Sequence, residues 1–451
     1  MMRPDFATRY GDERLPRYTS YPTSPHFSAS VGASAYGRWL AEISPETTAS
    51  LYLHIPFCRA MCWYCGCNTS VAKRDDIIET YVAALRHEVE QVTRLIPRRQ
   101  RVQHVHFGGG TPTILQPNTL VELVRLLRQS FDLAADAEVA IEIDPRTLDK
   151  DTASALAGCG VNRASLGIQS FDPLVQQSIN RTQTVAQTAS VVAALRRRGV
   201  NGINFDLIYG LPHQTVASCI ETVLRCVELR PDRFSVFGYA HVPGFKPHQR
   251  RIAENSLPDG AERYRQFEAI ADLLGDCGYQ RIGLDHFCLP DDVMSRTHSR
   301  GELRRNFQGY TTDASNILLG FGASAIGRLQ QGYVQNEAGV RAYMEAVTSD
   351  SLATVKGYVL TDEDRLRGEI IERIMCDFGA DIGRICERHC RVPHSVLGAS
   401  SRLEQLVEDG IVTVNGSSLR VADDARFLVR TVAAAFDSHL GQSGASHSRA
   451  V

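Results

Sequence analysis

Four cysteines within ten residues are the strongest chemical feature of this sequence. They lie in the segment CRAMCWYCGC as Cys58, Cys62, Cys65 and Cys67, whereas the other eight are scattered. Thiolates are soft ligands that suit iron–sulfur clusters or zinc, and a short loop can place three sulfurs on three corners of one cubane cluster. The fourth iron then stays open to a ligand that carries amino and carboxylate groups. The spacing therefore predicts a cluster held by Cys58, Cys62 and Cys65.

Two other interpretations of these cysteines have to be weighed. Positions 58, 62 and 65 also have helical spacing, and buried cysteines pack like small hydrophobic side chains, but Pro56 and Gly66 disfavour a continuous helix. A structural zinc site made by all four sulfurs is the stronger rival. A second pair, Cys386 and Cys390, lacks a third sulfur nearby, so we expect it to pack structurally on a helix.

The elements that must position these residues alternate between short β-branched runs and amphipathic helical stretches, which is typical of βα units and a parallel sheet. Six strands are expected, at residues 51–55, 102–107, 139–144, 164–169, 203–208 and 234–239. The clearest helices are expected at 76–96, 120–131 and 261–274. A further strand is expected at 281–287, and a hairpin at 411–414 and 418–421 around Asn415–Gly416.

Each predicted strand has an apolar side and a polar side. In the third strand Val139 and Ile141 share one side, while Glu138 and Glu142 share the other. Unpaired carboxylates are costly in a dry interior, so the polar sides must line a lumen that holds water, cofactor or substrate. We therefore predict an α/β protein built on an open parallel (β/α)6 barrel, with the cysteines at the carboxyl end of its first strand.

Composition and length set the remaining expectations. Lys and Arg (49) nearly balance Asp and Glu (51), so no overall charge favours nucleic acid or a membrane surface, and no apolar run suggests a signal peptide or membrane span. We expect a cytoplasmic monomer. Its predicted parts are an arm covering the site (1–48), the barrel (49–330), a mainly helical C-terminal domain (331–440) and a disordered tail (441–451).

The cysteine spacing, with an aromatic residue before the third cysteine, resembles the radical S-adenosylmethionine (SAM) superfamily. Further segments resemble the oxygen-independent coproporphyrinogen III oxidases within it. These segments are RYTSYPT at 17–23, Cys67, GGGTPT at 108–113, DLIYGLP at 206–212 and NFQGYTT at 306–312. The likeness extends from residue 14 to about residue 440, and the whole set in this order is highly specific.

The resemblance implies oxidative decarboxylation of two propionate side chains of coproporphyrinogen III to vinyl groups, which gives protoporphyrinogen IX in haem biosynthesis. It implies a [4Fe–4S] cluster, two SAM molecules and an electron donor of unknown identity. The hydrogen is taken from the propionate by a 5′-deoxyadenosyl radical, so the chemistry belongs to the cofactors while the protein aligns them. No side chain is assigned as catalytic, although Cys67 and Tyr52 are candidates.

The resemblance also implies the residues that contact the two SAM molecules. For the first SAM, at the cluster, they are Tyr52, Tyr64, Gly109, Glu142 and Ile326. For the second they are Gly110, Thr111, Gln169, Arg181, Asp206 and Ala240. Tyr52, Glu142, Gln169 and Asp206 also lie on the polar sides of their strands, so the two lines of reasoning agree.

The same residues have plainer interpretations. Glycines 108–110 let the backbone approach a ligand, but a tight turn needs them too. Glu142 and Asp206 suit an amino group or ribose hydroxyls, or else an ion pair with Arg181. For the substrate carboxylates we consider the segments that resemble the family, and the candidates there are Arg17, Arg304 and Arg305.

One position departs from the pattern expected of the family, because Gly238 stands where Asn is expected before Tyr239. This change is expected to loosen the site of the second SAM. The main rival function is a haem-binding chaperone of the same superfamily that does not decarboxylate. Such relatives typically lack the RYTSYPT arm, the Cys67 ending and the NFQGYTT segment, all of which are present here.

Overall fold

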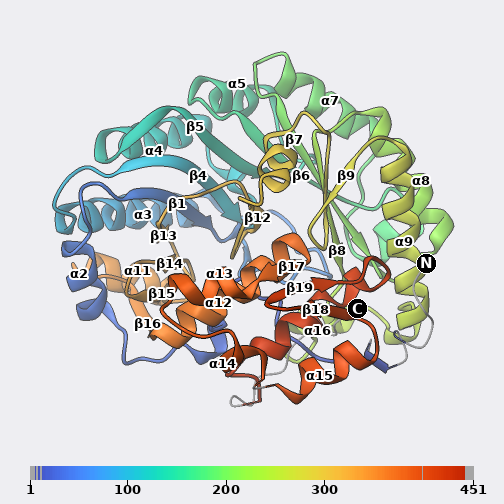
Figure 1. Ribbon diagram of the computed structural model, residues 1–451. Helices are drawn as coiled ribbons and strands as arrows, with labels where there is room; N and C mark the ends of the chain where they lie inside the picture. Colours follow the sequence, from blue (N-terminus) through green and yellow to red (C-terminus); the bar gives the residue numbers. More distant parts are fainter. Residues whose placement is uncertain (1–5, 7–8, 11–12, 399, 442–451) are drawn as a thin grey trace.

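The computed structural model describes residues 6, 9–10, 13–398 and 400–441, and it is an α/β fold around one large sheet (Figure 1). Six parallel neighbours follow one another in the chain and in space. They are β1 (Thr48–Ile55), β4 (Arg101–Gly109), β5 (Asp132–Ile143), β6 (Arg163–Gln169), β7 (Gly202–Tyr209) and β8 (Arg233–Gly238). The six expected strands are therefore confirmed, five of them within three residues at each end, whereas β5 begins seven residues before the expected start at residue 139.

The predicted sidedness of these strands is also present. Val139, Ile141 and Ile143 are buried, whereas Glu138 and Glu142 on the opposite side of the strand are only partly buried. The buried side packs under helices and forms the larger hydrophobic cluster, with Phe107 and Phe205 fully buried at its centre. The polar side faces the lumen, as expected for a sheet that holds polar groups away from its dry core.

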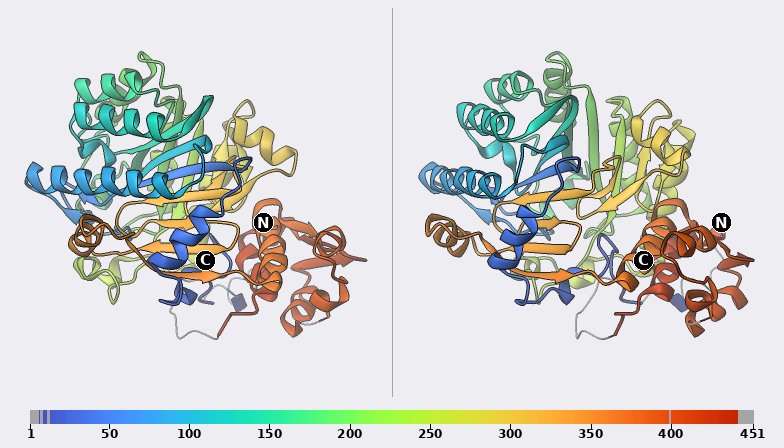
Figure 2. Two further views of the ribbon diagram at one scale, coloured as in Figure 1. Left: turned by 90° about the vertical axis from the view of Figure 1, so that its left-hand side faces the viewer. Right: turned by 60° about the vertical axis from the view of Figure 1, so that its left-hand side comes forward.

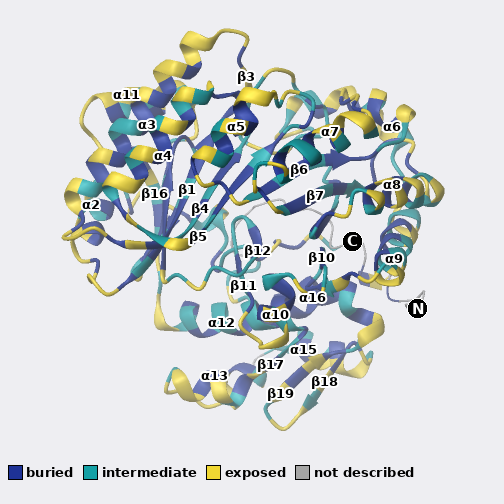
Figure 3. Cartoon of the chain, turned by 90° about the horizontal axis from the view of Figure 1, so that it is seen from above, coloured by how far each residue is buried: buried dark blue, intermediate teal, exposed yellow. Residues whose placement is uncertain are grey.

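The helices cover the apolar side of the sheet, with their exposed faces outward (Figure 3). They are α3 (Asp75–Leu95), α4 (Pro117–Ser130), α5 (Lys150–Gly158), α6 (Pro173–Ser178), α7 (Val185–Arg196), α8 (Val216–Glu228) and α9 (Gly260–Asp276). Helices α7 and α8 begin with capping boxes, in which Thr184 and Thr215 accept hydrogen bonds from the backbone three residues later. The three helices singled out from the sequence are confirmed as α3, α4 and α9.

The sheet is wider than the six expected strands. β13 (Ile317–Phe321) lies parallel to β1, and β14 (Ile326–Arg328), β15 (Gly332–Asn336) and β16 (Thr354–Val359) follow antiparallel. At the other edge, β10 (His286–Cys288) and β9 (Gln280–Ile282) follow β8. Among the described residues the sheet thus has twelve strands, and both edges of the six-stranded core are extended.

Two local expectations change in the structure. The strand expected at 281–287 is divided into β9 and β10, because Gly283 turns with a φ of +56° and the ring of Tyr310 fills the space beside it. The segment 304–312 forms a small hairpin of β11 (Arg304–Asn306) and β12 (Gly309–Thr311), in which Arg305 pairs with Tyr310. This hairpin lies between the barrel and the C-terminal helices (Figure 1).

The helical part of the chain begins later than residue 331. β15, β16 and α11 (Val340–Thr348) belong to the main sheet and its core, and the C-terminal unit, which we define as residues 362–441, starts at α12 (Asp362–Asp377). It also contains α13 (Ile382–Arg388), α14 (His394–Leu397), α15 (Ser401–Glu408), α16 (Val429–Ala433) and a three-stranded sheet of β17 (Gly379–Asp381), β18 (Val412–Asn415) and β19 (Ser418–Val421). The hairpin expected around Asn415–Gly416 is confirmed as β18 and β19.

The N-terminal arm is shared between the two parts. Phe6, Leu15 and Tyr21 pack in the hydrophobic cluster of the C-terminal unit, whereas α2 (Ala33–Ala41) packs against the main core through Trp39 and Leu40. Figure 2 shows the first segments of the chain beside the C-terminal helices. The arm therefore ties the C-terminal unit to the barrel. Except for Gly441, the tail expected at 441–451 lies outside the described residues.

The described helices were also compared with the length and hydropathy that a membrane crossing requires. Within residues 6–441, leaving aside the few positions that are not described, none of them meets both conditions.

Candidate active site

The cysteine loop, residues 58–67, leaves the carboxyl end of β1 at the edge of the sheet where the other parallel strands also end. The short strands β2 (Phe57–Cys58) and β3 (Ser70–Val71) pair at its base, and the Ala72 amide donates to the Cys58 carbonyl at 3.0 Å. The far side of the loop is fixed by side chains, since Asn180 Nδ2 donates to the Met61 carbonyl at 2.8 Å. The loop therefore has a defined shape at the position where barrel enzymes bind their reactants.

Cys58 is fixed at the start of the loop by two threonines. Its Sγ atom lies 3.3 Å from Thr111 Oγ1 and 3.5 Å from Thr69 Oγ1. Burial raises the pKa of Cys58, and these hydrogen bonds act in the opposite direction. At the other end of the loop, a hydrogen bond from the Cys67 thiol lowers the pKa of Cys65 below its ordinary value. Hydroxyl and thiol donors thus favour sulfur in its anionic form, which is the form that binds metal.

Two arginines point at the buried Cys62. Arg181 Nη1 lies 3.5 Å from its Sγ atom and Arg146 Nη2 lies 3.7 Å from it. Both guanidinium groups are held by Asp144, with Arg146 Nη2 2.6 Å and Arg181 Nη2 3.4 Å from its carboxylate oxygens. Burial acts to raise the pKa of Asp144, but the two arginines outweigh burial and the pKa is lowered. The sulfur of Cys62 therefore lies in a positive environment made by two guanidinium groups.

The ion pair considered for Arg181 from the sequence is therefore different in the structure. Arg181 pairs with Asp144, on the loop after β5, and donates to the Gly167 carbonyl at 2.7 Å. Glu142 and Asp206 bind other partners. The reason is geometric, because the Arg181 side chain runs across the carboxyl ends of β5 and β6 rather than into the lumen below them.

The cysteine loop fits a cluster better than a single ion. Three thiols on one loop, each with a donor or a cation at its sulfur, match the ligand chemistry of an iron–sulfur cluster. Among the residues that the structure describes, no three Cys, His, Asp or Glu side chains converge closely enough to hold one metal ion.

Tyr52 and Glu142 lie side by side above the lumen. The Tyr52 hydroxyl lies 3.0 Å from His54 Nδ1, and its ring stacks on His106 at 5.9 Å between centroids. Glu142 Oε2 accepts the Gly109 amide at 3.1 Å, and its Oε1 lies 3.3 Å from His106 Nε2. The carboxylate is therefore positioned by backbone and imidazole while its side chain stays partly exposed for a ligand.

Glycines 108–110 are required by close packing within the chain. A Cβ atom at Gly108 would lie 2.8 Å from Glu142 Oε1, and one at Gly109 would lie 2.7 Å from the His54 ring. At Gly110 it would lie 2.6 Å from the Phe57 carbonyl oxygen, directly beside Cys58. The glycines thus let the loop and the carboxylate side chain approach the end of β4. Neither a tight turn nor the approach of a ligand alone accounts for this packing.

Gln169 lies next to Arg181 at the end of β6. It has a φ of +68° at an irregularity in the pairing with β7, and it is buried. A Cβ atom at Gly167 would lie 2.8 Å from Gln169 Nε2 and 2.9 Å from Arg181 Nη2, so both side chains pass over this glycine. A non-glycine residue in this backbone conformation is uncommon and is often found at functional sites.

Tyr64 and Ala240 are joined by one side chain that sequence reasoning did not identify. Gln249 Nε2 donates to the Tyr64 carbonyl at 2.9 Å and to the Ala240 carbonyl at 3.2 Å. Ile326 lies on the opposite flank, where its carbonyl would be 2.6 Å from a Cβ atom at Gly320, the residue that pairs with Tyr52. Ala240 and Ile326 therefore border the site mainly through their backbones.

Asp206 lies deeper in the lumen with neutral polar neighbours. Ser165 Oγ donates to its Oδ2 at 2.7 Å and Asn204 Nδ2 to its Oδ1 at 2.8 Å. Burial raises the pKa of Asp206 to about 6, and the nearby charge of Glu142 adds to this effect. Asp206 is thus held as a strong hydrogen-bond acceptor whose ionisation is costly until a ligand donates to it.

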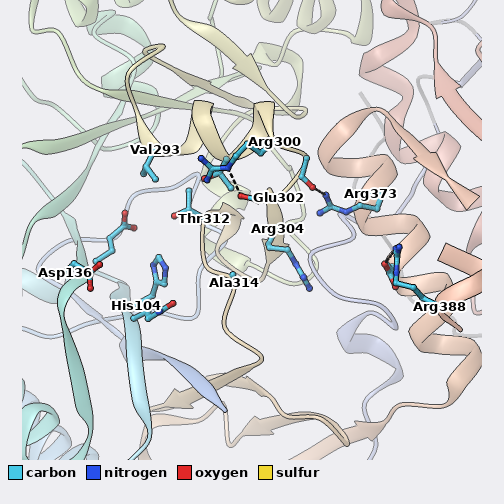
Figure 4. A pocket seen from close by; sticks show the side chains of 15 residues that line it. His104, Asp136, Val293, Arg300, Glu302, Arg304, Thr312, Ala314, Arg373 and Arg388 are labelled. Carbon is cyan, nitrogen blue, oxygen red and sulfur yellow. Dashed lines mark hydrogen bonds and ion pairs between the residues drawn. The ribbon is translucent and has the colours of Figure 1, made fainter. Parts of the chain in front are cut away.

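A large cavity lies at the opposite end of the strands from the cysteine loop (Figure 4). Its volume is about 780 Å³, and it is lined by His104 and Glu138 of the barrel and by Arg373 and Arg388 of the C-terminal unit. Arg304 also points into it and pairs with Glu372 at 3.0 Å. Of the three arginines expected to face substrate, Arg304 is therefore already neutralised within the protein.

Several residues around the site escaped the sequence analysis. Asp144 shares the polar side of its strand, but its pairing with Arg146 depends on the turn that follows. Three more residues act through hydrogen bonds. Thr69 contacts Cys58, His106 contacts Glu142, and Gln249 donates to the carbonyls of Tyr64 and Ala240. Their residue types are too common to identify a site by spacing alone.

Comparisons with known proteins agree with this geometry. The model of the radical SAM superfamily matches residues 52–226. A curated protein of Bradyrhizobium diazoefficiens, named oxygen-independent coproporphyrinogen III oxidase, is 59% identical over 450 residues and 100% of both chains. Proteins of the same name from Cereibacter sphaeroides and Escherichia coli are 40% and 38% identical, over 95% of this chain and 95% and 93% of theirs. The solved coproporphyrinogen III oxidase of Escherichia coli, described as a radical SAM enzyme, superposes with a TM-score of 0.90 at 36% identity, over 95% of this chain and 100% of that one.

Proposed function

The chain belongs to the oxygen-independent coproporphyrinogen III oxidases of the radical SAM superfamily, and from this premise we propose that Cys58, Cys62 and Cys65 hold the [4Fe–4S] cluster that starts its reaction. Its activity is the oxygen-independent conversion of coproporphyrinogen III in haem biosynthesis. When bound, the cluster and SAM would supply a 5′-deoxyadenosyl radical that takes a hydrogen atom from a propionate side chain, and the loss of carbon dioxide together with transfer of one electron to an electron acceptor would give the vinyl group. The protein's part is to bind, align and shield.

The observation that carries this proposal is the positive environment of Cys62 at the carboxyl end of the barrel. Arg181 and Arg146 both approach its sulfur, and Asp144 fixes the two guanidinium groups. A reduced cluster is more negative than an oxidised one, so these cations favour the electron-rich state. All twelve cysteines lie among the described residues and are free thiols, which suits a reducing compartment, and we place the reaction in the cytoplasm.

We assign the first SAM to Tyr52, Tyr64, Gly109, Glu142 and Ile326. Glu142, which accepts the Gly109 amide and stays partly exposed, would accept hydrogen bonds from the amino group of SAM, and Tyr52, Tyr64 and Ile326 would enclose the ligand. We assign a second SAM to Gly110, Thr111, Gln169, Arg181, Asp206 and Ala240. Its support is the approach of the Gln169 and Arg181 side chains to the same glycine, Gly167, and the hydrogen bonds from Gln249 to the carbonyls of Ala240 and Tyr64. Asp206 suits ribose hydroxyls, because it is a partly buried carboxylate that accepts hydrogen bonds.

The test is an anaerobic reaction of the reconstituted protein with coproporphyrinogen III, SAM and a reductant. We expect vinyl product and 5′-deoxyadenosine from the wild type. Cys62→Ala should lose most of its iron and all product, whereas Cys390→Ala, which changes an exposed cysteine of the C-terminal unit, should keep both.

Three outcomes would contradict parts of the proposal. Haem binding without product would favour the chaperone interpretation. An unchanged iron content in Cys62→Ala would remove the cluster assignment. One bound SAM per chain at saturation, measured by equilibrium dialysis, would remove the second SAM but leave the first.

A further inference from the structure

Arg305 is a buried cation whose side chain is only partly satisfied. Its side chain faces inward from β11, and the residue is 9% exposed. Nη2 donates to the Arg17 carbonyl at 3.2 Å, whereas Nε and Nη1 are buried and have no hydrogen-bond partner in the described part of the chain. The guanidinium stacks over the Tyr310 ring at 4.4 Å, which orients it but does not satisfy these donors. Buried unpaired donors destabilise a fold, so this arrangement needs a further reason.

Two more arginines lie around the same point. Arg430 is buried, and its Nε donates to the Pro16 carbonyl at 3.0 Å. Arg17 follows in the arm, is exposed, and has Nη2 3.5 Å from the Gly238 carbonyl. Burial, and after it the charges of Arg17 and Arg305, lower the pKa of Arg430 to about 9. We call Arg17, Arg305 and Arg430 the arginine cluster.

The carboxylates near the arginine cluster are bonded elsewhere. Asp285 attracts Arg305 and Arg17, but its Oδ1 lies 2.7 Å from His286 Nδ1. Glu372 accepts Arg304 Nε and the Arg305 backbone amide, both at 3.0 Å, so it does not bind the Arg305 guanidinium. The arginine cluster therefore has more positive than negative charge. Arg17 in the arm is the member of the cluster that is exposed to solvent.

The arginines of the large cavity provide a contrast within the same protein. Each of the four pairs with a carboxylate: Arg300 with Glu302, Arg304 with Glu372, Arg373 with Asp377 and Arg388 with Glu369. Figure 4 shows these side chains around the cavity, with dashed lines for the pairs among the residues drawn. An incoming anion would have to compete with those carboxylates. No carboxylate of residues 13–398 or 400–441 forms an ion pair with the Arg305 guanidinium, so an anion there would meet no such competitor among them.

The arginine cluster is also connected to the site in the lumen. Asp285 binds His286, whose Nε2 lies 3.3 Å from Ser235 Oγ. Ser235 donates to Asn204 at 3.2 Å, and Asn204 donates to Asp206 at 2.8 Å. A chain of hydrogen bonds thus runs from Asp285, which attracts Arg305 and Arg17 electrostatically, to Asp206, a residue that we assign to the second SAM. A ligand that spans both regions would therefore lie along one continuous series of polar groups.

We propose that Arg305, together with Arg17, binds a propionate carboxylate of the tetrapyrrole substrate. This inference rests on the proposed function, which supplies a substrate with four such groups. A carboxylate has the charge and the paired oxygens that a guanidinium fork requires, and the bond would satisfy Nε and Nη1 of Arg305 at once. Arg17 would close the site from the arm side.

The experiment measures binding of coproporphyrin III, the stable oxidised tetracarboxylate, to the anaerobic holoprotein by fluorescence quenching. We expect Arg305→Gln to weaken binding by about 10- to 100-fold, because charge-assisted hydrogen bonds are lost, and Arg17→Gln to weaken it less. The matched control is Arg304→Gln, the adjacent residue that pairs with Glu372, and it should stay within about twofold of the wild type. The tetramethyl ester of the porphyrin has no carboxylates, so the wild type and Arg305→Gln should bind it with equal affinity.

Equilibrium dialysis with SAM distinguishes the other source of a carboxylate. If Arg305→Gln weakens SAM binding and leaves coproporphyrin binding unchanged, the assignment to a propionate is overturned. If the wild type forms product and Arg305→Gln binds coproporphyrin III as tightly as the wild type does, this inference alone is overturned. A wild type that forms no vinyl product overturns the proposed function instead.

A structural role for Arg305 predicts a different result. Removing a partly unpaired buried charge should leave the free energy of unfolding unchanged or raise it, so Arg305→Gln should lose affinity without losing stability or iron. Arg305→Lys keeps the charge but lacks the fork, and it should bind with intermediate affinity. A loss of affinity in Arg305→Gln that tracks a loss of stability, with no recovery in Arg305→Lys, would contradict the proposal.

Discussion

The Nη1 atom of Arg181 lies 3.5 Å from the Sγ atom of Cys62, so a buried cation contacts a proposed cluster ligand directly. The same guanidinium binds Asp144 and passes beside Gln169 over Gly167. One side chain therefore joins the cysteine loop to the residues assigned to the second SAM. A change at Arg181 should be detectable both in the electronic properties of the cluster and in cofactor binding.

The first prediction concerns the reduction potential of the cluster. Replacing Arg181 by Gln removes a positive charge and a hydrogen bond at Cys62, and both stabilise the reduced state. If about 1 kcal/mol is lost, the midpoint potential falls by roughly 40 mV for a one-electron couple. A redox titration followed by electron paramagnetic resonance measures it. Arg128→Gln is the control, because Arg128 donates to the Cys159 carbonyl outside the loop, and an equal shift there would contradict the assignment.

The second prediction concerns the glycine run beside Cys58. In Gly110→Ala the new methyl would lie 2.6 Å from the Phe57 carbonyl oxygen, and this backbone must move. We expect a destabilisation of roughly 1–3 kcal/mol and incomplete iron incorporation. Chemical denaturation and iron analysis measure these effects. Gly66→Ala, within the cysteine loop but with no atom within 4 Å of the added methyl, should match the wild type. Normal stability and iron content in Gly110→Ala would show that neither property depends on the close packing at Gly110.

The third prediction concerns pH. Burial raises the pKa of Asp206 to about 6, so the folded protein binds this proton more tightly than the unfolded chain does. The resulting stability is fully present below about pH 4 and is lost as the pH rises through about 6. The change amounts to about 3 kcal/mol, because one pKa unit corresponds to about 1.4 kcal/mol.

Urea denaturation of the wild type and of Asp206→Asn from pH 4 to 7 isolates this contribution. As the pH rises, the unfolding free energy of the wild type should fall relative to that of Asp206→Asn. A constant difference would mean that the carboxyl group ionises normally. Added SAM should reduce the shift, because hydroxyl donors from a ligand stabilise the ionised carboxylate.

Much of the barrel could be predicted because its strands combine two independent signals. In residues 138–144 the apolar Val139, Ile141 and Ile143 alternate with a set of positions that holds Glu138, Glu142 and Asp144, and the structure buries the three apolar side chains. The cysteine loop could be recognised because four sulfurs within ten residues seldom occur unless they bind a metal. These features are local, so spacing alone is sufficient to identify them.

The rest depends on contacts between distant segments. β13 to β16 extend the sheet beside β1, but the segment that forms them does not repeat the βα alternation. Arg304 and Arg305 are adjacent and equally plausible as substrate contacts in the sequence. Only the packing of β11 against α12 and the arm turns Arg304 toward Glu372 and buries Arg305. In the same way, the partner of Arg181 is set by a turn after β5.

The last prediction concerns Gly238, where the family pattern leads us to expect Asn. A Cβ atom at this position would lie 2.9 Å from the Tyr209 hydroxyl and 3.2 Å from Arg263 Nη2. Tyr209 pairs with Gly238 in the register of β7 and β8, so its ring occupies the space that an Asn side chain would need. The space that an Asn side chain would occupy at position 238 is thus taken by the Tyr209 ring, so this part of the site is packed and not loose.

A double-mutant cycle tests this relationship. Gly238→Asn should destabilise the wild type by roughly 1–3 kcal/mol through overpacking, and Tyr209→Ala should remove at least about 1 kcal/mol of that cost, since residues in contact couple by about 0.5–3 kcal/mol. Gly244→Asn, with no atom within 4 Å of the added Cβ, is the matched control. If Gly238→Asn costs the same with and without the Tyr209 ring, that ring does not fill the space. Because Arg17 reaches the Gly238 carbonyl, a displaced Tyr209 should also weaken coproporphyrin III binding in Gly238→Asn, and the double variant should recover part of it.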